Sequence, residues 1–180
     1  MVYHSIEEIY GALDETRARL AASVEGLAEG REHFRPAPER WSIADIMEHL
    51  AAVESSSLRL FDKLLQKAEA EGRARAEGRP FAPVTIAEHS ERSRREKYQS
   101  PEAARPTGRV PLADSLRSLR ASLEALHALR PRIERAECSE VSFPHAAFGP
   151  LNLYQWLLFT AAHEERHLAQ IEALKEEMKA

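Results

Sequence analysis

Apolar residues recur at every third or fourth position in four long stretches of this chain, which is the spacing of one face of an α-helix. The first stretch begins at Ser5, a helix-capping residue followed three positions later by Glu8, and its helix is expected to reach about Ala28. The second helix begins at Ser42 by the same signal and is expected to reach about Glu71.

The third and fourth stretches also carry start signals. Pro111 suits a first helical turn, and leucines follow it at spacings of three and four: Leu112, Leu116, Leu119, Leu123, Leu126 and Leu129. We expect Pro131 to end or kink this helix, because proline has no amide hydrogen to donate. Asn152 caps the fourth helix after a turn at 148–150, and that helix is expected to reach about Lys179.

Residues 72–110 connect the second and third helices and are rich in Arg, Glu, Gly and Pro. A short helix is expected there, from Thr85 to about Tyr98. A crossover of this length lets the two helices run in the same direction, and long connections of this kind are functional or mobile. No stretch alternates like a β-strand. The sequence therefore predicts an all-α four-helix bundle with a long crossover between helices 2 and 3, as one domain over 1–180.

Composition narrows the class of protein. Of the 180 residues, 43% are hydrophobic and 30% charged, as in ordinary globular proteins. A net charge of −4 argues against nucleic acid as a partner. Cys138 is the single cysteine, which fits a reducing compartment, and we expect a cytoplasmic protein. No signal peptide is recognisable, and no apolar run is long enough to span a membrane.

The most informative chemistry lies in the last helix, where His163 and His167 are four residues apart. Residues at this spacing lie one helical turn apart, about 6 Å along the axis, so both rings can reach one metal ion. Both lie on the stripe that includes Trp156, Thr160 and Ile171, so they are expected to face the interior. A buried imidazole needs a partner there, which is either a metal ion or a hydrogen-bonding group of the core.

Catalytic transition-metal sites usually take three protein ligands, so a third inward residue is needed. His49 fits, because it lies on the inner edge of the second helix beside Ile46 and Val53. His145, in the loop before the fourth helix, is the rival candidate and could instead cap that helix or form hydrogen bonds near the site. The remaining histidines fit less well: His4, His33, His89 and His127.

The segment from His163 to His167 also matches the HExxH pattern of zinc metalloproteases, in which the glutamate is the general base. We reject this interpretation for two reasons. No histidine follows His167 to serve as a downstream ligand, and a bundle offers no edge strand to bind a peptide substrate.

Two segments, 41–50 (WSIADIMEHL) and 148–171, resemble signatures of the DinB/YfiT-like superfamily, and the last-helix signature reads H-x-x-R-H-x-x-Q-I in this chain, from His163 to Ile171. The resemblance implies a four-helix bundle that holds one divalent transition metal through His49, His163 and His167. Zinc and nickel are the leading candidates for that metal, and iron and manganese also suit three histidines. One departure lies before the last helix, where many relatives read His-Pro and this chain reads Pro144-His145.

The family resemblance also implies a function. Characterised relatives are mostly thiol S-transferases, in which the ion activates a low-molecular-weight thiol, and this is the leading hypothesis. The alternatives are a metal-dependent hydrolase, with Glu164 or Glu48 as a base, and a non-catalytic stress-associated bundle that binds metal. A small-molecule substrate is expected, and such bundles can form homodimers.

Overall fold

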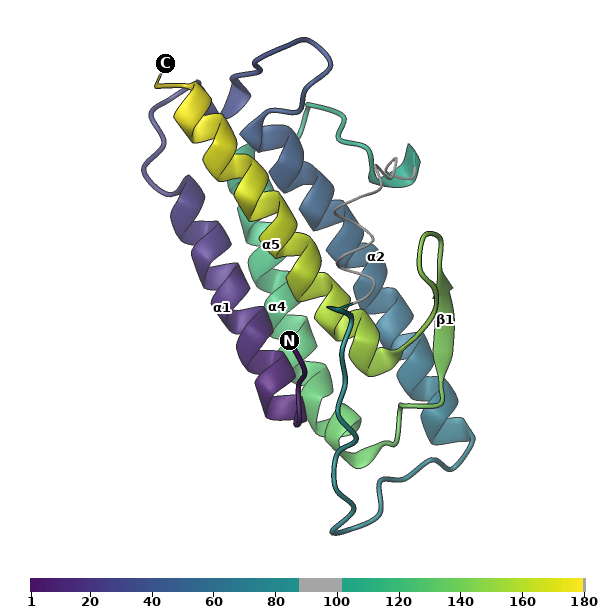
Figure 1. The fold of residues 1–180 in the computed structure, drawn as a ribbon. Helices are drawn as coiled ribbons and strands as arrows, with labels where there is room; N and C mark the ends of the chain where they lie inside the picture. Colours follow the sequence, from purple (N-terminus) through teal and green to yellow (C-terminus); the bar gives the residue numbers. More distant parts are fainter. Residues whose placement is uncertain (88–101, 180) are drawn as a thin grey trace.

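The computed structural model describes residues 1–87 and 102–179. Its long helices are α1 (Ile6–Val24), α2 (Ile43–Ala70), α4 (Leu112–Arg135) and α5 (Leu153–Glu177). They run up, down, down and up in Figure 1, so the crossover returns the chain from one end of the bundle to the other. Its short elements are the 3₁₀ helices η1 (Arg31–His33) and η2 (Glu102–Ala104) and the strands β1 (Ser142–His145) and β2 (Gly149–Asn152). The predicted four-helix bundle is therefore confirmed.

Helix boundaries follow the capping signals closely. Ser42 and Asn152 each form a capping box with the residue three positions on, and α2 and α5 begin directly after them. The first helix ends earlier than expected, at Val24 rather than Ala28. The chain turns at Gly26, whose φ of 73° lies in the left-handed region that favours glycine.

We expect Pro131 to end or kink the third helix, and the first alternative is wrong, because α4 continues to Arg135. Pro131 lies on the exposed side of α4, where a carbonyl that loses its amide partner can bond to water. The turn that follows is held by tertiary contacts. Ile133 is fully buried, and Arg132 forms ion pairs with Asp62 and Glu69 of α2. These packing contacts therefore stabilise the last turn of α4 by more than Pro131 destabilises it.

A short antiparallel hairpin precedes α5, although the sequence predicts no strand. Its strands have four residues each, too few to show alternation, and Pro144 pairs with Pro150. The indole of Trp156 donates a hydrogen bond to the Phe143 carbonyl and so ties the hairpin to α5. The helix expected from Thr85 to Tyr98 lies largely outside the described residues.

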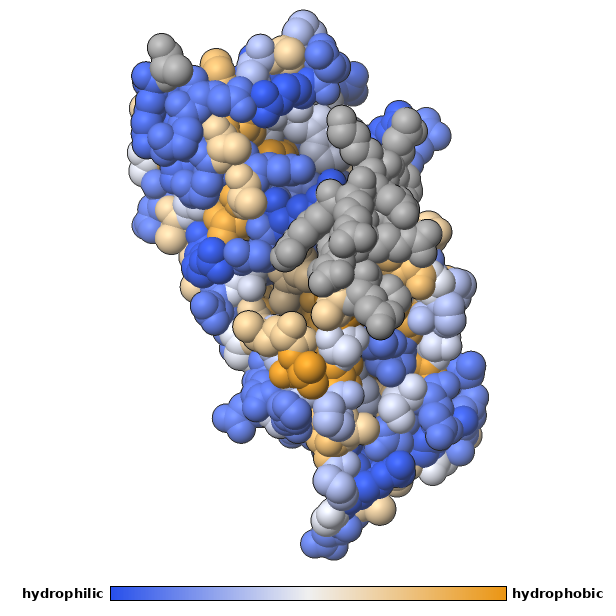
Figure 2. Space-filling view, viewed as in Figure 1, coloured by the Kyte–Doolittle hydropathy of each residue, from blue (hydrophilic) through white to orange (hydrophobic). Residues whose placement is uncertain are grey.

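Most of the face shown in Figure 2 is hydrophilic, especially at the two ends of the bundle, and apolar side chains gather along its middle. Within 1–87 and 102–179, no helix combines the length and the apolarity that crossing a lipid bilayer requires. The hydrophilic ends and the apolar interior agree with the amphipathic pattern from which the helices were predicted.

The interior contains two apolar clusters at different levels of the bundle. One includes Leu13, Phe61, Leu126 and Leu157. The other includes Leu20, Leu50, Leu119 and Leu168. Between these positions, each long helix contributes a buried polar residue: Arg17, Glu54, Ser122 and Glu164. A polar layer therefore crosses the middle of the bundle.

Arg17 is the centre of this layer and contacts all three other long helices. Its guanidinium forms ion pairs with Glu54 of α2 and Glu164 of α5 and donates a hydrogen bond to the Leu119 carbonyl of α4. The second carboxyl oxygens, Glu54 Oε1 and Glu164 Oε2, are buried without a hydrogen-bond partner among the described residues, so one guanidinium serves two buried carboxyl groups. Arg17, Glu54 and Glu164 are only 6%, 2% and 1% exposed.

Replacing Arg17 by Met is expected to lower the free energy of unfolding by about 3–5 kcal/mol, because two buried carboxyl groups lose their charge partner. Arg19→Met is the matched control, since Arg19, two positions after Arg17 on α1, forms an exposed ion pair with Glu165, the residue after Glu164 on α5. That pair is worth at most about 1 kcal/mol. Urea unfolding of both variants measures the difference, and equal losses would contradict the central role of Arg17.

Glu54→Gln is expected to remove a pH dependence of stability. Burial raises the pKa of Glu54 well above its ordinary value, and Glu164 raises it further. Folding therefore favours the protonated form, and this contribution is complete below about pH 4.3 and is lost as the pH rises through the raised pKa. Urea unfolding at a series of pH values should show wild-type stability falling relative to Glu54→Gln across that range. Parallel curves would contradict the raised pKa of Glu54.

Candidate metal centre

Helices α2 and α5 supply three histidines that meet in the interior. His49 lies in the second turn of α2, and His163 and His167 lie one turn apart in α5. The Nε2 atom of His163 is 3.3 Å from Nε2 of His49 and 3.2 Å from Nε2 of His167. One ring nitrogen from each of the three lies within 4.8 Å of the others. The structure thus brings together the three residues predicted as ligands.

The second ring nitrogen, Nδ1, orients two of these rings. His49 Nδ1 is 2.7 Å from the Ala104 carbonyl oxygen, and His167 Nδ1 is 2.8 Å from Oε1 of Gln170. Both partner atoms are acceptors, so each Nδ1 donates its hydrogen. In a neutral ring of this tautomer the free lone pair is on Nε2, the atom that faces the other histidines.

A cation between the rings would satisfy lone pairs that the three rings cannot fully satisfy for one another. A neutral His163 has at most one hydrogen on Nε2, which cannot satisfy the lone pairs of both neighbouring nitrogens. Burial lowers the pKa of His49, and burial with the neighbouring histidines lowers the pKa of His163 well below its ordinary value. Burial and His49 lower the pKa of His167 to about 3. The rings are therefore neutral near pH 7, which leaves the Nε2 lone pairs of His49 and His167 available to a metal ion.

The spacing of the nitrogens suits a transition metal. Imidazole nitrogens bind zinc at about 2.0–2.1 Å, so two ligands of a tetrahedral ion lie about 3.4 Å apart. The observed Nε2 separations of 3.2 and 3.3 Å are close to this value. Neutral imidazole is also a good ligand for nickel and iron, so the donor set fits a divalent transition metal without selecting one. Metal binding by the triad stays a prediction that this geometry supports.

Aromatic rings lie on two sides of the triad. The Trp41 ring centroid is 4.9 Å from that of His49 and 6.4 Å from that of His167, with which it stacks at 16°. On the other side the Phe159 ring stacks on His163 at 5.5 Å and 21°. His49 and His167 are accordingly only 4% and 3% exposed. His163 is only partly buried, so these surroundings limit the access of water without excluding it, and they would strengthen the field of an ion held there.

Neither carboxylate considered as a base faces an open site. Glu164 is buried against Arg17 and Glu54, as described above. Glu48 accepts hydrogen bonds from Thr107 and Gly108. Burial alone would raise the pKa of Glu48, but these hydrogen bonds outweigh it and hold that pKa below its ordinary value. Both carboxylates are thus engaged in holding the structure.

His145 lies beside the triad but outside the group of converging nitrogens. Its ring stacks on Phe148 at 4.5 Å and lies 4.6 Å from the ring of Phe159, which in turn stacks on His163. Its Nδ1 accepts a hydrogen bond from the Ala147 amide. His145 therefore lies near the triad, as expected, with the ring of Phe159 between it and His163.

The other histidines are placed elsewhere. His127 pairs with Asp14 at 2.7 Å, and His33 lies 3.6 Å from Glu32. His4 is exposed, and His89 lies outside the described residues. The role of Ala104 could not be read from the sequence, because it acts through its main-chain carbonyl. Gln170 did leave a signal, since it is the glutamine of the last-helix signature, three residues after His167.

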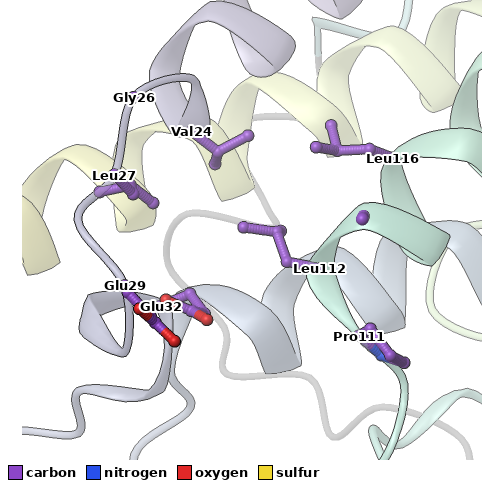
Figure 3. Close-up of a pocket in the computed structure, with 9 residues that line it drawn as sticks. Val24, Gly26, Leu27, Glu29, Glu32, Pro111, Leu112 and Leu116 are labelled. Atoms are coloured by element: carbon purple, nitrogen blue, oxygen red, sulfur yellow. The ribbon is translucent and has the colours of Figure 1, made fainter.

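A cleft of about 370 Å³ lies away from the histidines, at the end of the bundle where α1 ends and α4 begins. Figure 3 shows Val24, Leu112 and Leu116 on its apolar side and Glu29 and Glu32 at its edge. None of its lining residues belongs to the triad. The cleft and the candidate metal centre are therefore separate features.

Comparisons with known proteins place this geometry in a family. The family model of the DinB superfamily matches residues 12–171, so the chain belongs to the DinB superfamily. It is 24% identical over 169 residues to the uncharacterized protein YuaE of Bacillus subtilis (strain 168), covering 92% of this chain and 96% of YuaE.

Two solved structures share the fold. TT2238, described as a four-helix bundle protein, matches with a TM-score of 0.59 and 21% identity over 93% of this chain and 98% of its own. YfiT from Bacillus subtilis matches with a TM-score of 0.59 and 18% identity over 96% of this chain and 87% of its own. YfiT is described as "a probable metal-dependent hydrolase with an unusual four-helix bundle topology".

Substituting Ala for His49, His163 or His167 is expected to lower metal affinity by more than about 100-fold, because losing a ligand costs more than losing its hydrogen-bonding partner. Elemental analysis of protein purified without a metal-affinity column should show stoichiometric metal in the wild type and little in each variant. His127→Ala is the control and should keep its metal, since His127 pairs with Asp14. Full metal content in His49→Ala would overturn the three-ligand site.

Proposed function

We propose that this protein is a metal-dependent enzyme in which His49, His163 and His167 hold one divalent transition metal and the bound metal activates a low-molecular-weight thiol. The convergence of three Nε2 atoms, two of them with free lone pairs, supports this proposal most directly. A divalent ion held by neutral imidazoles keeps its full positive charge and lowers the pKa of a thiol or a water molecule bound to it.

Two observations favour a thiol as nucleophile over water. Glu48 and Glu164 are both engaged in hydrogen bonds or ion pairs, so neither is available as a general base. A free thiol has a pKa of about 8.5, whereas that of water is about 15.7, so a thiol needs much less help to ionise at neutral pH. The aromatic rings of Trp41 and Phe159 would shield the resulting thiolate from water.

Metal-dependent hydrolysis is the second candidate, and the description of YfiT favours it. Within 1–87 and 102–179, no fourth His, Cys, Asp or Glu joins the triad, which fits a centre with a position open to a reactant. The same feature argues against the third candidate, a non-catalytic stress-associated bundle, because structural metal sites usually have four protein ligands.

Reconstitution with zinc, nickel, iron or manganese allows the candidates to be separated. We expect the loaded protein to speed thiol consumption when a low-molecular-weight thiol is mixed with an electrophile such as monobromobimane. The same preparation is assayed against esters and amides in a pH-stat without thiol. The control is His163→Ala taken through the same loading, which should be inactive.

Each outcome decides between the candidates. Thiol consumption that requires both metal and His163 supports the thiol transferase. Metal-dependent release of acid from esters or amides without thiol overturns the thiol transferase and supports the hydrolase. Stoichiometric metal with neither activity overturns the enzyme and leaves the non-catalytic bundle.

A further inference from the structure

The last part of the crossover contacts α2 at two consecutive residues, Glu48 and His49. The carbonyl oxygen of Ala104 is 2.7 Å from Nδ1 of His49. Three and four residues after Ala104, the chain bonds to the carboxylate of Glu48, which accepts hydrogen bonds from the Thr107 amide at 2.8 Å, the Thr107 hydroxyl at 2.7 Å and the Gly108 amide at 3.0 Å. The segment 104–108 is therefore held against α2 beside a predicted metal ligand.

The two contacts differ in how they can be changed. The acceptor for His49 is a main-chain carbonyl, which no substitution at position 104 removes. The position of this carbonyl depends on the contacts that hold the segment 104–108. Glu48 holds the segment, because its carboxylate accepts three hydrogen bonds from it. Charge-assisted hydrogen bonds of this kind are about twice as strong as neutral ones. Glu48 is only 7% exposed, so water competes little for these bonds.

A second feature locates the same segment. Gly108 has a φ of 69°, and a Cβ built on it would lie 3.6 Å from Arg35 Nη2 and from Asp45 Oδ1. Arg35 and Asp45 are themselves paired at 2.9 Å near the start of α2. The turn at Gly108 thus lies on a surface that α2 and its preceding loop provide, and Glu48 fastens it there.

We propose that Glu48 is a positioning residue for the metal centre. By holding 104–108 on α2, it keeps the Ala104 carbonyl against His49 Nδ1, so that His49 stays in the tautomer whose Nε2 lone pair faces His163 and His167. This inference rests on the proposed function, because it assumes that the triad binds metal. Hydrogen-bonding partners of metal-binding histidines typically change metal affinity by about 10–100-fold when lost.

The test compares Glu48→Ala with two milder variants. Glu48→Gln keeps an acceptor for Thr107 but loses the one for Gly108, and Thr107→Val removes the hydroxyl from the crossover side. We expect cobalt or zinc affinity, measured by competition with a chelator, to fall about 10-fold or more in Glu48→Ala and less in the other two. The double variant of Glu48→Ala and Thr107→Val should lose no more affinity than Glu48→Ala alone. Glu69→Ala, which removes an exposed carboxylate paired with Arg132 on the same helix, is the control and should bind like the wild type.

A metal-free measurement separates this proposal from the proposed function. Ring ¹⁵N NMR shifts of His49 in the protein without metal should report the Nδ1–H tautomer in the wild type and a mixture of tautomers in Glu48→Ala. If the wild type binds no metal, the proposed function fails while the NMR comparison still decides the role of Glu48. Unchanged tautomer and unchanged affinity in Glu48→Ala would overturn the positioning role, as would an equal loss of affinity in Glu69→Ala.

Discussion

One buried cation, the guanidinium of Arg17, joins all four long helices at the middle of the bundle. Burying it requires partners on each neighbouring helix, because an unpaired charge in the interior is strongly unfavourable. Its ion pairs to Glu54 and Glu164 align α2 with α5 at one level. His163 directly precedes Glu164, and His49 lies five residues before Glu54, so the alignment that satisfies Arg17 also brings the three histidines together.

The segment from His163 to His167 therefore serves two purposes on two faces of one helix. The histidines face α2 and form the candidate metal centre, whereas Glu164 faces Arg17 and stabilises the fold. In the HExxH pattern of metalloproteases that glutamate is the general base. Here the Glu164 carboxylate forms an ion pair with Arg17, so the glutamate of the same motif has a structural role. In the function we propose, chemistry at this centre would depend on the ion and on the nucleophile it binds rather than on a neighbouring carboxylate.

Much of this arrangement follows from local sequence features. Capping residues such as Ser42 and Asn152 locate helix starts to within a residue, and helical spacing identified His49 as an inward residue beside a distant histidine pair. Features that depend on tertiary contacts could not be predicted from the local sequence. Helix α4 passes Pro131 because Ile133 and Arg132 pack beyond it, and the hairpin before α5 is too short to show alternation. The Arg17–Glu164 pair joins residues 147 positions apart, and the partner of His49 is a main-chain carbonyl.

The most direct test of the metal centre is anomalous diffraction from crystals of the wild-type protein purified without a metal-affinity column. Data collected on both sides of the absorption edges of zinc, nickel, iron and manganese would identify the ion and locate it. We predict one peak about 2.0–2.2 Å from the Nε2 atoms of His49, His163 and His167. A peak held instead by Glu54 and Glu164, or ordered histidine rings with no peak between them, would contradict the three-histidine centre.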